Sequence, residues 1–292
     1  MKISRIKCIS DLAEMHFTWW VNRKPGGMTP YLVADMILPC DDSCSSVLVG
    51  AHARVLLLAL KTLKRPRSFE QRACMEQRLR ALEGLQHPNV VRYLGNNLAS
   101  GDDEITLVMQ AWGVSLSSLV ASKHHVGSLY VFDFALHMLS ALVCLHGAGI
   151  VHGDVKTANV LYHGGVYKLC DVDEGGTGTA FYMSARRARR HPQASSEDTF
   201  SDTYALGLST LEVYTGSQPY SEIDNQLVVF ARVCAGEFPR SWSAVARSGY
   251  DQGCVSIVQA MLDSDIFSTT GSRASPQELI DVLLLLRQHG EL

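Results

Sequence analysis

The stretch "VHGDVKTANVLYHGGVYKLCDVD", residues 151–173, decides how the rest of this chain is interpreted. Asp154, Lys156 and Asn159 come first, and Asp171 follows after a Gly-Gly pair. Consecutive glycines suit the positive φ angles of a tight turn, so "NVLYH" and "VYKLCD" are predicted to form a β-hairpin. Four polar side chains around a hairpin are either catalytic residues or ordinary polar residues of a surface loop. The flanking sequence distinguishes the two possibilities.

Composition indicates an ordinary globular protein. The chain has 292 residues, of which 47% are hydrophobic and 19% are charged, and its formal net charge is −3. That length is sufficient for two lobes with separate cores. The slightly negative charge gives no reason to expect nucleic acid as a partner. No signal peptide is visible, and no apolar run approaches the roughly 20 residues of a membrane span, so we expect no membrane partner.

The eight cysteines are scattered along the chain, and none forms a CxxC pair. Cys40 and Cys44 have no second pair nearby, so their spacing does not indicate a metal site. A dense disulfide framework is not indicated either. The cysteine pattern therefore favours a reducing compartment, and we expect a cytoplasmic protein, with the nucleus as the alternative.

The pattern of apolar residues changes along the chain. Residues 1–30 have no clean period and form an N-terminal leader. Residues 31–110 predict short strands at 31–38, 46–50, 54–63, 90–95 and 104–110, with one helix at 68–85. Residues 129–148 are apolar nearly all round, which predicts a buried helix, and from residue 203 the chain is again mostly helical.

The motifs resemble a eukaryotic protein kinase domain of the serine/threonine type, from about residue 31 to 288. "HGDVKTAN" (152–159) is similar to the family's catalytic loop H-R-D-x-K-x-x-N, and "DVD" (171–173) is similar to its D-F-G. Four further blocks follow the family in the correct order: "ALKTL" (59–63), "LQHPNVVRYLG" (85–95), "GTAFYMSAR" (178–186) and "SDTYALGLSTLEVYTGSQPY" (201–220). Two of them, "HPNVVRYLG" and "TGSQPY", weakly resemble the MAP kinase kinase kinases.

The resemblance implies an α+β fold with two lobes. A small antiparallel-sheet N-lobe with one helix would cover residues 31–110, a hinge residues 110–113, and a mainly helical C-lobe residues 114–290. Together they would form a protein kinase domain over residues 31–290.

The resemblance also implies a role for each polar residue of the opening stretch. Asp154 would accept the proton of the substrate hydroxyl, and Lys156 would neutralise the transferred phosphate. Asn159 and Asp171 would hold Mg²⁺ on the phosphates of ATP, while Asp202 would brace the catalytic loop. The residues expected to bind the nucleotide are Lys61, Val47, Ala59, Met109, Gln110, Ala111, Trp112, Leu161 and Cys170.

Several positions depart from the family pattern. The glycine-rich loop aligns with "CDDSCSSV" (40–47), in which Cys40, Asp42 and Ser45 replace the three glycines. The helix glutamate that should pair with Lys61 falls at Arg78, and Glu76 lies about 200° away round the helix.

Other departures lie in the second half of the chain. Gly153 replaces the arginine of the catalytic loop, and Asp173 replaces the last residue of D-F-G. Arg186 replaces the glutamate of the A-P-E block, although its expected partner is present as Arg273.

Three functions remain open at this stage. The leading hypothesis is a serine/threonine kinase that transfers the ATP γ-phosphate to protein hydroxyls and is divergent and slow. The alternative is a pseudokinase that acts as a scaffold or allosteric partner, and a small-molecule kinase is the third reading. The cluster "RRARRHP" (186–192) either selects acidic or phosphorylated substrates or is a solvated basic face. Expected partners are therefore ATP and a protein substrate, with another kinase or an acidic protein as candidates.

Overall fold

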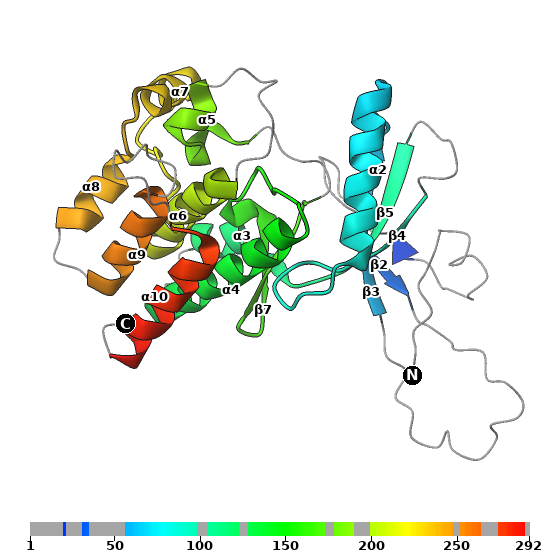
Figure 1. The fold of residues 1–292 in the computed structure, drawn as a ribbon, viewed down its shortest axis with the longest axis horizontal. Helices are drawn as coiled ribbons and strands as arrows, with labels where there is room; N and C mark the ends of the chain where they lie inside the picture. Colours follow the sequence, from blue (N-terminus) through cyan, green and yellow to red (C-terminus); the bar gives the residue numbers. More distant parts are fainter. Residues whose placement is uncertain are drawn as a thin grey trace, which may run out of the picture. The chain divides into compact units, whose positions relative to one another are not determined.

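A computed structural model describes residues 20–21, 31–34, 56–97, 104–122, 128–172, 178–189, 199–247, 252–263 and 274–289. The chain divides into two compact units, drawn in Figure 1. The first consists of Met1–Gln86 with Val91–Trp112, and the second of His87–Val90 with Gly113–Leu292. In the part of the chain that is described, no helix combines the length and apolar character needed to cross a membrane.

The described residues of the first unit form an antiparallel sheet of five strands and one helix, α2 (Phe69–Gly84). Ser68 caps this helix, since its side chain accepts a hydrogen bond from the Gln71 amide at 3.1 Å. The strands lie in the order β1-β2-β3-β5-β4. Their bounds are β1 (Trp20–Val21), β2 (Tyr31–Ala34), β3 (Leu56–Lys64), β4 (Tyr93–Asn96) and β5 (Glu104–Gln110).

The register of β3 against β5 determines which side chains share a face of the sheet. Ala59 pairs with Met109, and Lys61 pairs with Leu107. Because side chains alternate along a strand, all four lie on the same face. Ala59, Leu107 and Met109 are buried, whereas Lys61 is half-buried. Leu63 and its partner Ile105, the next pair on this face, are buried too, so Lys61 lies among apolar side chains.

Two details of this unit differ from the sequence prediction. β4 begins at Tyr93 rather than at residue 90, because Val90 forms an isolated parallel bridge with Leu169 of the second unit's hairpin. The short strand β1 lies inside the predicted leader and pairs with β2. The sequence did not predict β1, because two residues are too few to show the alternation of apolar and polar residues typical of a strand. The predicted strand at 46–50 lies outside the described residues.

The second unit is mostly helical and carries a three-stranded sheet. The sheet order is β6-β7-β8, and the β7–β8 pair is the hairpin predicted from Gly164 and Gly165, both of which have positive φ. The strands are β6 (Val114–Ser115), β7 (Val160–His163) and β8 (Val166–Leu169). The helices are α3 (Leu116–Ala121), α4 (Ser128–Gly147), α5 (Ala185–Arg189), α6 (Thr199–Thr215), α7 (Gln226–Ala235), α8 (Arg240–Arg247), α9 (Gln252–Asp263) and α10 (Pro276–Gln288), with the 3₁₀ turns η2 (Thr157–Asn159) and η3 (Ala180–Tyr182).

Helices α4 and α6 form the centre of this unit (Figure 1). Most apolar side chains between Val131 and Leu145 of α4 are buried, as the all-round apolar pattern predicts. Every residue of α6 from 201 to 213 is buried, including two carboxylates, Asp202 and Glu212. Charged side chains are rarely buried unless they are paired or hydrogen-bonded, so both carboxylates need an explanation.

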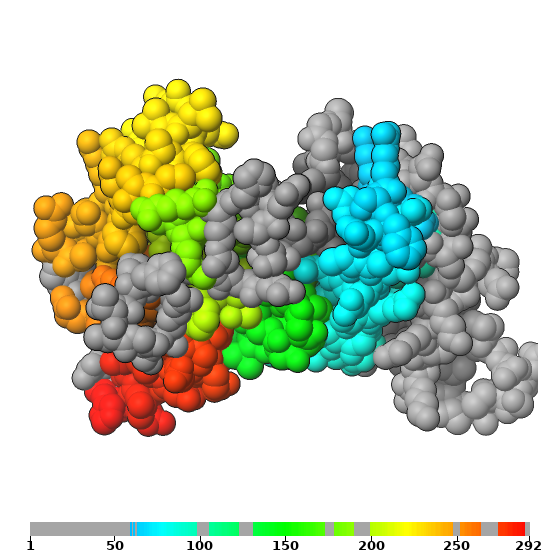
Figure 2. Space-filling model, turned by 45° about the horizontal axis from the view of Figure 1, so that its top comes forward, coloured from blue at the N-terminus to red at the C-terminus, as the bar shows by residue number. Residues whose placement is uncertain are grey.

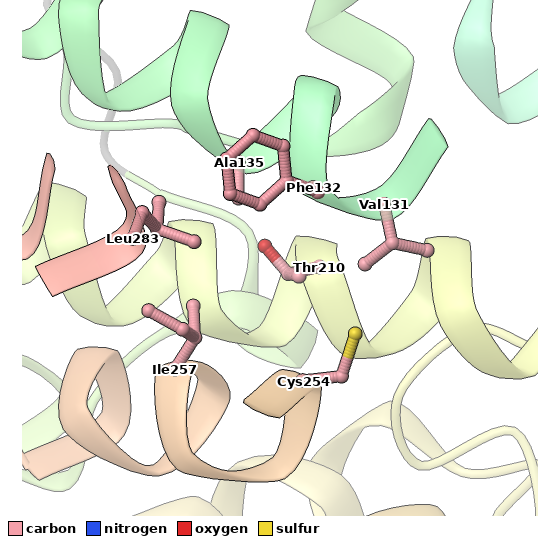
Figure 3. Close-up of a pocket in the computed structure, with 7 residues that line it drawn as sticks. All are labelled: Val131, Phe132, Ala135, Thr210, Cys254, Ile257 and Leu283. Carbon is pink, nitrogen blue, oxygen red and sulfur yellow. The ribbon is translucent and has the colours of Figure 1, made fainter. Parts of the chain in front are cut away.

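A small cavity lies where four helices of the second unit meet (Figure 3). In this view, side chains from α4, α6, α9 and α10 point toward one another around the gap. The lining residues are Val131, Phe132, Ala135, Thr210, Cys254, Ile257 and Leu283. The Thr210 hydroxyl donates to the Leu206 carbonyl at 2.8 Å, so the polar group of the lining is already satisfied. The cavity is therefore a packing feature of the core.

Exposed apolar side chains occur on two helices of the second unit. Helix α7, which is yellow at the surface in Figure 2, carries Leu227, Val228 and Phe230, and α10 carries Val282, Leu284 and Leu285. Exposed apolar residues are common on globular proteins, so neither group assigns a function by itself.

Candidate active site

The catalytic-loop segment is tied to strand β8 through His152, which is fully buried. Its Nδ1 accepts the Asp154 amide at 3.1 Å, and its Nε2 lies 2.9 Å from the Cys170 carbonyl oxygen. A carbonyl oxygen can only accept, so the ring carries its proton on Nε2. The imidazole thus fixes the position of Asp154 relative to the residue that precedes Asp171.

Asp202 of α6 holds the same loop from the other side. Its carboxylate accepts the amides of His152 and Gly153 at 2.8 Å each, and the His146 Nε2 at 2.9 Å. Burial alone would raise the pKa of Asp202, but the hydrogen bonds from the His146 side chain and the Gly153 amide lower it overall. Gly153 has a φ of 80°, which glycine adopts without the steric cost of a side chain.

Asp154, Lys156 and Thr179 form a closed triangle of hydrogen bonds. The Thr179 hydroxyl donates to Asp154 Oδ1 at 2.8 Å, and Lys156 Nζ donates to Asp154 Oδ2 at 2.6 Å. Lys156 Nζ also donates to the Thr179 oxygen at 2.8 Å. Burial tends to raise the pKa of Asp154, but Lys156 and Thr179 together lower it, so the carboxylate is held ionised. Sequence reasoning had assigned no catalytic role to Thr179.

Asn159 and Asp171, the predicted magnesium ligands, lie at one end of the β7–β8 hairpin. Asn159 directly precedes β7, and Asp171 follows β8 by two residues. The Cys170 amide donates to the Asn159 carbonyl at 2.9 Å, which places Asp171 one residue beyond this bond. The Asn159 side-chain amide donates to the Asp154 carbonyl at 2.9 Å, so its nitrogen faces Asp154. Asp171 has a φ of 65°, an uncommon conformation for a residue other than glycine and one associated with functional positions.

These two residues fit a magnesium ion. A carboxylate and an amide oxygen are hard donors of the kind that Mg²⁺ prefers, and Mg²⁺ is usually held by one or two carboxylates plus substrate phosphates. Within the described residues no group of three His, Cys, Asp or Glu side chains could hold a metal alone. A magnesium ion held by Asn159 and Asp171 would take further ligands from the phosphates of a bound nucleotide.

The second buried carboxylate of α6, Glu212, accepts hydrogen bonds from two different loops. The Thr157 hydroxyl lies 2.9 Å and the Tyr182 hydroxyl 2.5 Å from the same oxygen, Oε2. All three side chains are buried. Burial raises the pKa of Glu212, and burial beside this carboxylate raises the pKa of Tyr182. The sequence held one signal for this site, a single carboxylate within the apolar helix at 203–213.

The remaining predicted nucleotide-binding residues are divided between the units. Ala59, Lys61 and Met109 share one face of the first sheet, and Gln110, Ala111 and Trp112 follow at the end of β5. The Gln110 amide donates to the Arg92 carbonyl at 2.9 Å. Leu161 and Cys170 belong to the second unit, on β7 and just after β8. Val47 lies outside the described residues, so its role stays a prediction.

The structure places some of the residues that differ from the kinase family pattern. Glu76 forms an ion pair with Arg80 one turn along α2 at 3.3 Å, so the structure gives Glu76 a partner on its own helix. Arg186 lies in the first turn of α5 and is half-buried. The replaced glycine-rich loop at 40–47, Asp173 and Arg273 lie outside the described residues.

Comparison with known proteins agrees with this geometry. The family model "Protein kinase domain" matches residues 43–282, which is most of the chain. The chain belongs to the protein kinase family. The bilobal α+β fold expected from the motifs is confirmed, with a small antiparallel sheet unit and a mostly helical unit in this kinase.

The kinase is similar to several curated serine/threonine kinases. It is 30% identical to mitogen-activated protein kinase kinase kinase 5 of Arabidopsis thaliana over 183 residues, covering 56% of this chain and 25% of that protein. It is 28% identical to MAP kinase kinase kinase wis4 of Schizosaccharomyces pombe over 216 residues, covering 63% of this chain and 15% of that protein. It is 27% identical to serine/threonine-protein kinase SSK22 of Saccharomyces cerevisiae over 198 residues, covering 57% and 14%. The matched region thus spans a quarter or less of these relatives.

Proposed function

We propose that this kinase transfers the γ-phosphate of ATP to serine or threonine hydroxyls of a protein. The observation that carries the proposal is the triangle of Asp154, Lys156 and Thr179. Phosphoryl transfer depends on positioning and charge neutralisation more than on covalent chemistry. An ionised carboxylate braced by a lysine and a hydroxyl supplies both requirements in one place.

Each residue of the site has a distinct role in this proposal. Asp154 accepts the proton of the attacking hydroxyl, and Lys156 neutralises charge that develops on the transferred group. Asn159 and Asp171 would hold Mg²⁺, which, when bound, neutralises the phosphates of ATP. Lys61, on the face shared with Ala59 and Met109, would contact the α- and β-phosphates. His152 and Asp202 keep the loop in place without touching substrate.

A pseudokinase scaffold is the second candidate, and one observation favours it. The family's helix glutamate is absent at Arg78, and Glu76 is paired with Arg80 along the same helix. The chain could then bind a partner without transferring phosphate. Retention of Lys61, Asp154, Lys156, Asn159 and Asp171 favours the enzyme, because a scaffold has no physical need for the complete set.

The similarity to MAP kinase kinase kinases supports another kinase as the substrate, and an acidic protein is the alternative that the arginines of α5 favour. We further propose a cytoplasmic location from the scattered cysteines.

Radiolabelled transfer from Mg²⁺–ATP tests the enzyme proposal, with a catalytically dead MAP kinase kinase and dephosphorylated casein as the two acceptors. We expect transfer by the wild-type chain and none by Asp154→Asn. A wild-type chain that neither transfers phosphate nor binds Mg²⁺–ATP at millimolar concentration would support the scaffold instead.

A further inference from the structure

The arginines of α5 lie on different sides of that helix. The sequence is compatible with two explanations of this cluster, a site that selects acidic substrates and a solvated basic face. Ala188 belongs to one buried cluster with Val229 and Val233 of α7, so its side chain marks the packed face of α5. Successive residues of a helix are about 100° apart, so Arg187 and Arg189 flank this packed face on opposite sides. The two side chains therefore meet different surroundings.

Arg189 joins α5 to α7, which lie side by side in Figure 1. Its Nε donates to the Cys234 carbonyl at 2.6 Å, in the last turn of α7. A cation at this end of a helix also complements the helix dipole. The contact gives Arg189 a structural role between the two helices.

Arg187 lies on the side of the proposed active site. Its amide donates to the Oγ of buried Ser184 at 3.2 Å, which fixes the backbone at this position. A Cβ atom added at Gly178 would come within 3.3 Å of Arg187 Cζ and Nη2, so the guanidinium packs against this glycine. Gly178 has a φ of 86° and directly precedes Thr179, whose hydroxyl donates to Asp154. The charge of Arg187 is therefore next to a residue of the catalytic triangle.

The exposure of α5 argues against a solvated basic face at this position. Arg189 is exposed, but Arg186 and Arg187 are half-buried. Arg186 stands where the family has a glutamate, so a group that would repel an anion is replaced by a cation. Helix α5 itself contains no carboxylate that could neutralise its three arginines.

We propose that Arg187 is a specificity-determining residue that binds an anionic side chain of the protein substrate near the hydroxyl that is phosphorylated. The anion is a carboxylate or a phosphoryl group, since a guanidinium has five N–H donors and binds either group with two parallel hydrogen bonds. An extended chain spans about 3.3–3.6 Å per residue, so a substrate side chain within about three residues of the reacting hydroxyl can reach Arg187. This inference rests on the proposed transfer to protein hydroxyls and assigns the substrate an acidic or phosphorylated sequence.

A panel of peptides tests the assignment on the full chain. Each peptide has one serine in a neutral sequence, with a single Asp, phosphothreonine, Ala or Arg at one of the three positions on either side. The best anionic peptide should have a kcat/KM about tenfold above that of its Ala counterpart, as expected for one hydrogen bond to a charged group. A preference for both anions supports a carboxylate site, and a preference for phosphothreonine alone supports a site for phosphorylated substrates. The absence of any anion preference would overturn the proposal.

Substitutions distinguish Arg187 from a diffuse basic surface. Arg187→Gln removes the charge, so the ratio of kcat/KM for the anionic and Ala peptides should fall to about one. Arg187→Glu should make the Arg peptide the better substrate, a reversal that loss of a merely structural contact does not produce. Arg189→Gln is the matched control on the same helix and should keep the wild-type ratio. Equal loss of the ratio in both Gln variants would contradict the specific role of Arg187.

Peptide binding gives a second measurement that does not depend on phosphate transfer. Fluorescence anisotropy compares the same peptides with alanine in place of the serine. If the chain transfers no phosphate but binds the anionic peptide more tightly through Arg187, the site stands while the enzyme proposal fails. If transfer to anionic and neutral peptides is equal and Arg187→Gln leaves the ratio unchanged, the site fails while the enzyme proposal stands.

Discussion

The Thr179 hydroxyl donates to Asp154 Oδ1 at 2.8 Å, so the proposed base is already hydrogen-bonded to the segment that follows the metal site. Lys156 occupies the other carboxylate oxygen at 2.6 Å. Proton transfer in the reaction therefore requires a substrate hydroxyl to share or replace one of these contacts. Substitution of Asp154, Lys156 or Thr179 one at a time can therefore separate the role of the base from the roles of the two groups that hold it.

Asp154→Asn should abolish phosphate transfer while leaving ATP affinity nearly unchanged. A positioned base acts in the transition state, and its removal typically costs roughly 10²–10⁴-fold in rate. Fluorescent-nucleotide titration and single-turnover transfer, run on the same preparation, measure the two effects separately. Loss of nucleotide affinity in parallel with rate would show that Asp154 does not act as the base.

Transfer activity should not depend on phosphorylation of the activation segment. Gly153 has no side chain that could bind a phosphate group on the activation segment. Residues 172–185 are also too few to fold a phosphorylated residue back toward Gly153. A phosphate on Thr179 would place two negative charges against the ionised Asp154, so Thr179→Glu should inactivate the enzyme. Phosphatase treatment followed by a transfer assay checks the first statement. Activity lost on treatment, with a phosphate mapped to Thr177 or Thr179, would contradict it.

Asp202→Asn should destabilise the fold by about 3–5 kcal/mol at neutral pH, because it leaves buried donors without their charged acceptor. The pKa of Asp202 is lower in the folded state, so its stabilisation is present above the unfolded-state pKa of about 3.9. That stabilisation is lost as the pH falls through the folded-state pKa.

Urea unfolding at pH 7 and at progressively more acidic pH should therefore show the gap between wild type and variant shrinking in acid. Asp281→Asn is the matched control, since this carboxylate is exposed and accepts a hydrogen bond from the Gln277 side-chain amide. A gap that stays constant down to the acid transition would contradict the assigned role of Asp202.

The sequence predicted the parts of the site that depend on residue type and spacing. The order of Asp154, Lys156, Asn159 and Asp171, the glycine hairpin and the buried α4 all follow from local patterns. The two hydrogen bonds to Glu212 do not, because Thr157, Tyr182 and Glu212 are up to 55 residues apart in the chain and meet only after α6 is packed. The placement of Val90 beside β8 rather than in β4 likewise depends on a contact distant in sequence.

Cys170 should react with electrophiles directed at the ATP site, and ATP should protect it. The residue directly precedes Asp171 and is half-buried, and its thiol lies 3.2 Å from the Asn159 carbonyl. Buried Cys254 is the internal control, because an inert thiol in the core should label slowly with or without nucleotide. Mass spectrometry of labelled peptides measures both sites at once. Labelling of Cys170 that ignores ATP would place this thiol outside the nucleotide site.

Arg78→Glu should raise transfer activity several-fold. In the kinase family, a carboxylate from the helix of the small lobe holds the strand lysine against the α- and β-phosphates, and here that position is Arg78. Glu76 does not supply the missing charge, since it pairs with Arg80 at 3.3 Å on its own helix. A glutamate at position 78 would restore an acceptor for Lys61, and the KM for ATP should fall as kcat rises.

Two controls make the result on Arg78 specific. Arg78→Gln removes the cation without supplying a carboxylate, so it should give a smaller gain than Arg78→Glu. Glu76→Gln breaks only the pair with Arg80, and pairs of this exposed kind are worth about 0.3–0.5 kcal/mol, so activity should hold. If Arg78→Glu then loses its gain when Lys61→Met is added, the new carboxylate acts through Lys61. An equal gain in the presence and absence of Lys61 would show that the position counted from the motif is not the one facing the nucleotide.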